Sequence, residues 1–320
     1  MIHFGVAGYP PAFNQSKYRK DRLAISQWLI ELGLDAFEMQ MTYGPRTSVE
    51  NCIEHRKRAE QAGIKISVHA SYFIVFTSDD ETKIRQSNDT LKKTFEAADL
   101  LGATAVVLHP GPLYGRDGRE PLDRFIENAG RCLGEIGKTE IGLFVETAGK
   151  IGQLGSIDEI LDICRHVDGV FPCIDFGHVH ARTLGSLEEP KAIDSLVDQL
   201  VSFIESKINP RIHFHYTPIH FGHRGEIQHR AIDDRYAPIA QHAMFGMHGP
   251  GEGSGDGFYH PRVDPVGRAL RRIPIDCTVI SETHNSQEVG ALALKRIFAT
   301  RAQSIGEQEN KRKSQKRAQP

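Results

Sequence analysis

The sequence lacks any run of 18 apolar residues, and it does not open with a charged segment followed by an apolar stretch. We therefore expect no membrane span and no secretory signal. Cysteines are few, five in 320 residues, and they are scattered without a Cys-x-x-Cys pair. We expect a protein of the reducing cytoplasm whose thiols lie in the core.

The chain also has little excess charge of either sign. Its formal net charge is −2, so the composition as a whole does not indicate nucleic-acid binding. Basic residues gather only locally, at 17–22, 56–58 and 311–317. The last cluster lies in a polar, basic tail, 304–320, which we expect to be disordered because it has no apolar periodicity. This tail could contact phosphates or simply be a solvated end.

Hydrophobic residues, at 39%, and charged residues, at 25%, have the proportions of a globular protein with a sizeable core. Several short apolar segments are continuous rather than alternating, as in parallel strands that helices cover on both sides. The predicted strands are residues 3–8, 35–40, 64–70, 104–110, 141–149, 170–178, 211–217 and 277–283. The predicted helices between them are 21–33, 88–101, 120–136, 157–166, 188–206 and 287–302.

Eight strands that alternate with helices predict an α/β fold, a (β/α)8 TIM barrel forming a single catalytic domain over residues 1–303. An open doubly wound sheet is the alternative, but no Gly-x-Gly-x-x-Gly follows the first strand. One long connection, residues 217–263 after the seventh strand, is rich in Gly, His and Pro. A connection of this length is usually functional or mobile.

The active site of such a barrel lies at the C-terminal ends of its strands. Six consecutive predicted strands carry imidazole or carboxylate groups there. The residues are His69, His109, Glu146, Asp175 with His178, His213 with His215, and Glu282. One strand-end histidine could be a half-buried capping residue, but six strands in register predict a metal centre.

These ligands offer nitrogen and oxygen without thiolate. They suit Zn²⁺, with Mn²⁺ or Fe²⁺ as alternatives, in a catalytic rather than a closed structural site. Their number exceeds the needs of one ion and indicates a cluster, in which Glu146 and Glu282 could bridge two ions. Paired ions about 4 Å apart promote in-line displacement at phosphorus.

Five motifs in this order, IKISVHASY, VVLHPG, VETAG, IDFGH and ISET, resemble the endonuclease IV family of abasic-site nucleases, within the xylose isomerase-like barrels. FGVAGYP and LGLDAFEMQ resemble its shorter archaeal-type members, and the resemblance extends to about residue 300. It implies a DNA repair hydrolase, a zinc-dependent barrel that cuts double-stranded DNA on the 5′ side of abasic sites. It also implies up to three zinc ions, a metal-bridged hydroxide as nucleophile, and Glu146 as the catalytic bridge. We expect it to act as a monomer.

The resemblance also implies a ligand set for each ion. His69, His109 and Glu146 would hold the first. Glu146 would bridge to the second, which Asp175, His215 and Glu282 complete. His178, with a partner from the segment after the seventh strand, would hold the third.

The partner of His178 is where this sequence departs from the better-studied members, which have an Asp-x-His pair before a Gly-Glu-Gly run. Residues 213–229 hold five histidines and end in GEIQH, which offers Glu226 and His229. We expect His229 to be the ligand with Glu226 beside it, and His248, near a true Gly-Glu-Gly, is the alternative. His213 points the same way as His215 and is an alternative ligand on that strand.

Residues directly after the third strand insert into the DNA stack in this family, which makes Tyr72 and Phe73 candidate wedges beside a flipped-out sugar. Arg46 is a candidate phosphate or stack-filling contact. Each could instead be an ordinary loop residue.

Two other classes of function stay open. A divalent-metal sugar isomerase or epimerase would use the quartet Glu146, Asp175, His215 and Glu282 but has no need of His69 and His109. A non-catalytic scaffold is a third class, although structural zinc sites are normally closed sets of four ligands.

Overall fold

The computed structural model describes residues 1–116, 119–235 and 257–300. Eight parallel strands close into a barrel in the order β1-β10-β7-β6-β5-β4-β3-β2, and the predicted single-domain (β/α)8 fold is confirmed. The barrel strands are β1 (Ile2–Ala7), β2 (Ala36–Gln40), β3 (Lys65–His69), β4 (Ala105–Leu108), β5 (Gly142–Glu146), β6 (Val170–Asp175), β7 (His213–Tyr216) and β10 (Cys277–Ser281).

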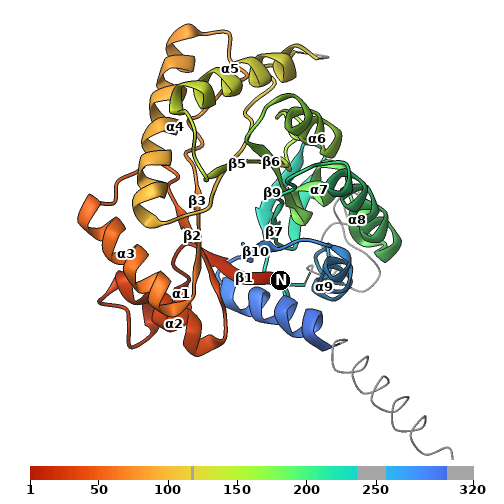
Figure 1. Cartoon of the computed structure of the whole chain (residues 1–320). Coiled ribbons are helices and arrows are strands. Elements are labelled where there is room, and N and C mark those ends of the chain that lie inside the picture. The colour runs from red at the N-terminus through yellow and green to blue at the C-terminus, as the bar shows by residue number, and fades with distance from the viewer. Residues whose placement is uncertain (117–118, 236–256, 301–320) are drawn as a thin grey trace, which may run out of the picture.

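Helices surround the strands (Figure 1). They are α1 (Pro11–Gln15), α2 (Ile25–Leu32), α3 (Val49–Ala62), α4 (Glu81–Leu101), α5 (Glu120–Ile136), α6 (Ile157–His166), α7 (Phe176–Arg182), α8 (Pro190–Glu205), α9 (Val263–Ala269) and a helix at 287–300. Helix α4 begins earlier than the predicted residue 88, because the Asp80 carboxylate accepts hydrogen bonds from the Thr82 and Lys83 amides.

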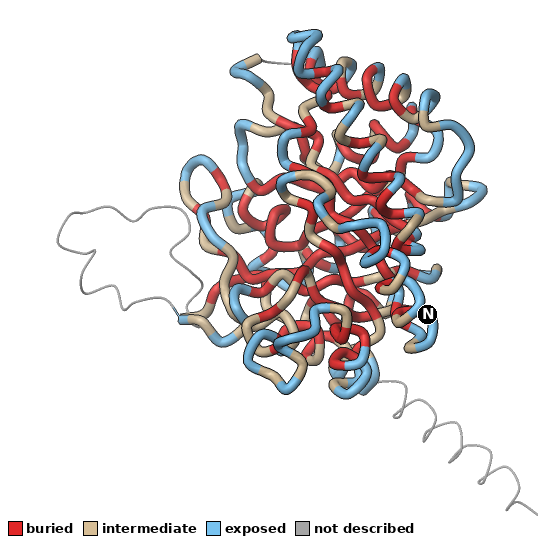
Figure 2. Tube along the Cα trace, turned by 90° about the vertical axis from the view of Figure 1, so that its left-hand side faces the viewer, coloured by how far each residue is buried: buried red, intermediate tan, exposed pale blue. Residues whose placement is uncertain are grey.

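The apolar runs that predicted the strands form the centre of the molecule, where buried residues are concentrated (Figure 2). All five cysteines are free and buried. The register aligns chemical groups at the C-terminal ends of adjacent strands: Gln40 pairs with His69, and Asp175 pairs with His215. Because the strands are parallel, these ends meet at one mouth of the barrel.

The described residues of the long segment after β7 include two strands that the sequence analysis did not predict. Strands β8 (Ile219–Gly222) and β9 (Gly225–His229) pair antiparallel in a hairpin. Gly225, at φ +86, approaches the chain after β5 so closely that an added Cβ would lie 2.0 Å from the carbonyl oxygen of Gly149. The Glu226 amide donates to that same carbonyl at 3.0 Å, which docks β9 against the barrel mouth.

Among the described helices, none combines the length and the apolar content that a transmembrane span requires. The tail 304–320 and His248, both subjects of predictions, lie outside the described residues.

Candidate metal centre

Glu146, the last residue of β5, lies at the centre of the barrel mouth and is completely buried. Its Oε2 atom is 3.1 Å from His69 Nε2 and 3.4 Å from His109 Nε2. Its Oε1 atom is 3.1 Å from the Nδ1 atoms of both His178 and His215. The two carboxylate oxygens therefore face two different sets of imidazoles, which is the placement that a bridging carboxylate needs.

A second group of potential ligands shares Glu146. Ligand atoms of Glu146, Asp175, His215 and Glu282 all lie within 4.8 Å of one another. Asp175 accepts a hydrogen bond on Oδ1 from the His178 amide at 2.7 Å, whereas its buried Oδ2 atom has no hydrogen-bond partner. A buried carboxylate oxygen without a donor is costly, and a bound cation would satisfy it.

The hairpin supplies the third group. Glu226 on β9 lies with its Oε2 atom 3.6 Å from His178 Nε2, and its Oε1 atom is 3.5 Å from His229 Nε2. The structure thus places Glu226 between His178 and His229, the three residues that the sequence analysis grouped around one ion. An added Cβ on Gly149, the glycine of VETAG, would come within 2.7 Å of the Glu226 side chain, so this approach requires glycine.

Three of the imidazoles are oriented by backbone carbonyls. The Nδ1 atom of His69 lies 3.0 Å from the Ala70 oxygen, and that of His178 lies 2.9 Å from the Thr147 oxygen. His229 Nδ1 lies 3.2 Å from the oxygen of Glu282. When Nδ1 donates its proton to a carbonyl, the lone pair of Nε2 is free to bind a metal ion.

The donor set therefore fits transition-metal ions. It consists of neutral imidazole nitrogens and anionic carboxylate oxygens, in groups whose ligand atoms lie within 4.8 Å of one another, with one carboxylate oxygen lacking a donor.

The electrostatics of the centre depend on close pairing of opposite charges. Burial lowers the pKa of His69, but the carboxylate of Glu146 outweighs it and raises this pKa to about 9. Burial lowers the pKa of His109 to about 4. Burial alone would raise the pKa of Glu226, but the imidazoles beside it hold that pKa at about 2. Burial, reinforced by Glu146, raises the pKa of Glu282. In the metal-free protein, protonated imidazoles thus offset the negative charge of the carboxylates. A bound metal ion would replace those protons.

Glu38 is a member of this region that the sequence interpretation missed. It lies in β2, fully buried, with its Oε2 atom 3.2 Å from His213 Nε2 and its Oε1 atom 3.2 Å from His215 Nε2. His213 does point into the barrel with His215, but its ring reaches Glu38 rather than Glu146. The available signal was a lone acidic residue in the otherwise apolar start of the strand AFEMQ.

The predicted DNA-contacting residues lie at the rim. Tyr72 is exposed, and its ring stacks on that of His109 with centroids 5.5 Å apart. Phe73 is also exposed, and its ring lies 6.2 Å from that of Tyr43. The guanidinium of Arg46 lies 5.5 Å from the centre of the same Tyr43 ring.

Two further histidines of the hairpin stay away from the centre. His220 lies against the ring of Tyr259, with centroids 5.7 Å apart, and His223 is exposed at the turn. Of the five histidines in 213–229, the structure turns His215 and His229 towards the grouped carboxylates at the mouth.

A closed barrel that gathers six imidazoles and five carboxylates into overlapping groups defines a TIM-barrel protein with a multi-ligand candidate metal centre. The chain belongs to the xylose isomerase-like TIM barrel family, which it matches over residues 26–305. This match and the similarity to probable endonuclease 4 proteins confirm the resemblance stated from the motifs.

Two curated relatives illustrate the range of the family. The chain is 26% identical over 238 residues to the uncharacterized protein MJ0133 of Methanocaldococcus jannaschii, covering 73% of this chain and 83% of that protein. It is 30% identical over 161 residues to the probable endonuclease 4 of Nitratidesulfovibrio vulgaris, covering 47% and 57%. The alignment thus spans little more than half of that second relative.

Solved structures share the fold. Endonuclease IV from Thermus thermophilus superposes with a TM-score of 0.58 at 19% identity, covering 93% of this chain and 97% of that one. D-psicose 3-epimerase from Clostridium cellulolyticum gives 0.58 at 14% identity, covering 90% and 89%. Superposition therefore does not distinguish a nuclease from an epimerase. The side chains at the barrel mouth have to be compared instead.

Proposed function

We propose that this protein is a zinc-dependent endonuclease that hydrolyses the phosphodiester on the 5′ side of abasic sites in double-stranded DNA. The observation that carries the proposal is the number of ligand groups around Glu146. A mononuclear sugar epimerase needs only the quartet of Glu146, Asp175, His215 and Glu282. This chain adds His69 and His109 on one side, and the hairpin pair Glu226 and His229 with His178 on the other.

Zinc, when bound, would supply a Lewis acid and lower the pKa of water to about 7. The residues that would hold it are His69, His109 and Glu146, then Glu146, Asp175, His215 and Glu282, then His178, Glu226 and His229. Glu146 belongs to two of these sets, because its two oxygens face in different directions. Because Glu146 lies between these two sets, its position fixes how far apart the ions they hold would be.

Residues at the rim of the barrel mouth would bind the DNA. Tyr72 leans over His109 with one face of its ring, while 57% of the residue remains accessible to stack on a base or sugar. Phe73, Tyr43 and Arg46 extend this surface to the loop after β2. Aromatic rings and a stacked guanidinium are the groups that bind unpaired nucleotides.

The test uses purified, zinc-loaded full-length protein, a duplex with one abasic site, and the same duplex without the lesion. We expect a nick at the abasic site with a 3′-hydroxyl, no cleavage of the intact duplex, and about three zinc ions per chain by elemental analysis. Intact abasic DNA under these conditions would exclude the proposal.

Epimerisation of a ketose is the second candidate, because the quartet by itself forms one four-ligand group. It predicts about one divalent ion per chain and interconversion of keto sugars. The same preparation can be assayed for both activities, so the two candidates are decided together.

A further inference from the structure

Glu38 is a buried carboxylate held from four directions. Its Oε2 atom accepts a hydrogen bond from Ser67 Oγ at 2.9 Å, and its Oε1 atom accepts one from Gln40 Nε2 at 3.1 Å. The Nε2 atoms of His213 and His215 complete the surroundings, each 3.2 Å away. With polar groups around it from its own strand, from the adjacent β3 and from β7 across the barrel, the side chain has little freedom to rotate.

His215 connects Glu38 to the metal centre. Its Nδ1 atom faces Glu146 at 3.1 Å and Glu282 at 3.5 Å, whereas its Nε2 atom faces Glu38. A neutral imidazole has one lone pair and one N–H group. If Nδ1 gives its lone pair to an ion between Glu146 and Glu282, the proton is on Nε2 and points at Glu38.

The other histidines of the centre have weaker supports. His69, His178 and His229 each place Nδ1 on a backbone carbonyl. The carboxylates that also approach the Nδ1 atoms of His178 and His229 are Glu146 at 3.1 Å and Glu282 at 3.8 Å, and both belong to the proposed ligand sets. Within the described part of the chain, His215 is the histidine of this centre whose second nitrogen meets a carboxylate from outside the proposed ligand sets. A carboxylate in this position fixes the tautomer and orientation of the ring and makes it a stronger ligand.

We propose that Glu38 is a positioning residue of the metal centre: it accepts the Nε2 proton of His215 and so directs Nδ1 to the ion shared with Glu146. The inference rests on the metal centre of the proposed function and not on the reaction. Glu38 touches neither substrate nor ion. Its effect appears in metal affinity, because a partner of this kind typically contributes 10- to 100-fold.

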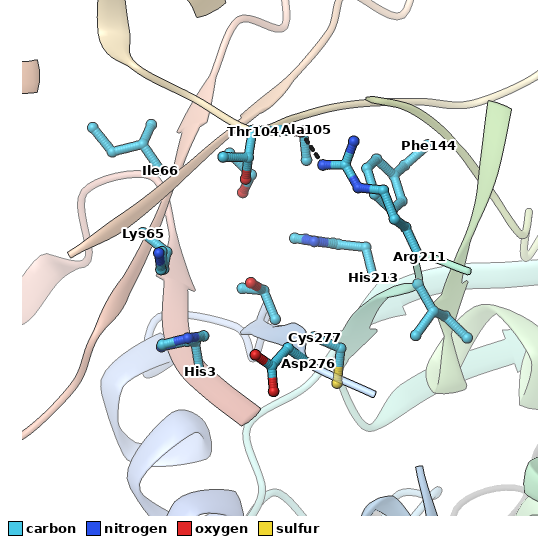
Figure 3. Close-up of a pocket in the computed structure, with 13 residues that line it drawn as sticks. His3, Lys65, Ile66, Thr104, Ala105, Phe144, Arg211, His213, Asp276 and Cys277 are labelled. Carbon is cyan, nitrogen blue, oxygen red and sulfur yellow. Dashed lines mark hydrogen bonds between the residues drawn. The ribbon is translucent and has the colours of Figure 1, made fainter. Parts of the chain in front are cut away.

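His213 has a separate part in this arrangement. A cavity of about 190 Å³ opens at the N-terminal end of the barrel, opposite the metal centre, and is lined by Ser67, Arg211 and His213 among others. Figure 3 shows the His213 ring extending into this cavity from the β7 side. His213 therefore contacts Glu38 on one side and lines the cavity on the other, while Glu38 itself is fully buried.

The same three residues could instead hold an ion of their own, because Glu38, His213 and His215 offer ligand atoms within 4.8 Å. That arrangement would require His215 to give lone pairs from both nitrogens, which a neutral imidazole cannot do. We therefore assign a hydrogen bond to the Glu38–His215 pair, whereas the buried Nε2 atom of His213, 3.2 Å from Glu38, makes none. An ion found between Glu38 and His213 would overturn the assignment.

The test compares Glu38→Met, Glu38→Gln and His213→Gln in the full-length protein, by zinc content and by zinc affinity in chelator competition. Glu38→Met removes the acceptor, and we expect about 10- to 100-fold weaker binding of one ion. Glu38→Gln keeps an oxygen that can accept from Nε2, so it should retain more affinity than Glu38→Met. His213→Gln should keep the full number of ions.

Thermal unfolding of the metal-free variants separates positioning from a purely structural role. A structural role would lower the unfolding temperature in Glu38→Met and leave zinc affinity unchanged, and that outcome would overturn the proposal. If Glu38→Met does not fold, anomalous diffraction from the zinc-loaded wild-type protein decides. Zinc on His215 Nδ1 supports the proposal, and zinc between Glu38 and His213 refutes it. A protein that shows these metal effects without cutting DNA would contradict the proposed function alone.

Discussion

The Nε2 atom of His178, on the helix that follows β6, lies 3.6 Å from the Oε2 atom of Glu226, on β9, the second strand of the hairpin. These residues come from separate parts of the chain, and the close approach of Gly225 to Gly149 brings them together. The hairpin is therefore part of the candidate metal centre rather than a cover over it.

This contact predicts that the hairpin holds its own ion. Glu226→Gln and His229→Ala should each leave about one zinc ion fewer per chain, because each removes one ligand of a three-residue group. His223→Ala is the matched control, since His223 is exposed at the turn of the same hairpin. Full zinc content in both ligand variants, measured by elemental analysis, would separate the hairpin from metal binding.

Substitution of Tyr72 should lower DNA affinity rather than zinc content. Tyr72→Ala should weaken binding to an abasic duplex by roughly 5- to 150-fold, since stacking on an aromatic ring is worth about 1–3 kcal/mol. Zinc content should stay the same, because the phenol ring of Tyr72 supplies none of the grouped ligand atoms. Fluorescence titration of labelled duplex measures the affinity, with Phe73→Ala as a second variant on the same rim. Unchanged affinity for Tyr72→Ala would assign the ring to packing against His109.

Metal binding should compete with protons. The Glu146 carboxylate raises the pKa of His69 to about 9 against the effect of burial, so at pH 7 this imidazole is protonated in the metal-free protein. An ion must displace that proton, and zinc affinity should therefore rise with pH until about pH 9. Calorimetric titration at pH 7 in two buffers of different ionisation enthalpy measures the protons released. Zinc binding without proton release would contradict this charge balance.

The same pKa predicts how the metal-free protein responds to pH. A histidine whose folded pKa lies above its unfolded value of about 6.5 stabilises the fold most below pH 6.5, and that contribution is lost as the pH rises through 9. We expect the unfolding temperature of the metal-free protein to fall over this range and that of the zinc-loaded protein to fall less. Equal slopes for the two forms would argue against protonated His69.

Much of the fold could be predicted because parallel barrel strands are buried on both faces. Continuous apolar runs such as AVVL in β4 and GLFV in β5 are typical of such strands. Helix α3 did not stand out, since only Cys52, His55 and Ala59 of its 14 residues are buried and most of its other residues are polar. Its periodic signal was accordingly weak.

The ligands at strand ends could be predicted because a parallel barrel places all of those ends at one mouth. Two parts of the site could not. The hairpin depends on the approach of Gly225 to Gly149, a contact between residues 76 positions apart that no local pattern encodes. Glu38 lies in the middle of β2 rather than at its end, and its meaning depends on which ring nitrogen of His215 faces it.

The central claim is that Glu146 connects the ligand sets of a catalytic metal centre, and Glu146→Gln tests it most directly. Glutamine keeps the size of the side chain but cannot bridge two cations as an anion. Glu205→Gln, at an exposed position ending α8, is the control for the same chemical change. The measurement is single-turnover cleavage of an abasic duplex together with a binding titration on that duplex. The account predicts a rate lower by at least about 10³-fold, with DNA affinity retained and the control unchanged. Near-wild-type cleavage by Glu146→Gln would remove Glu146 from the centre and contradict the account.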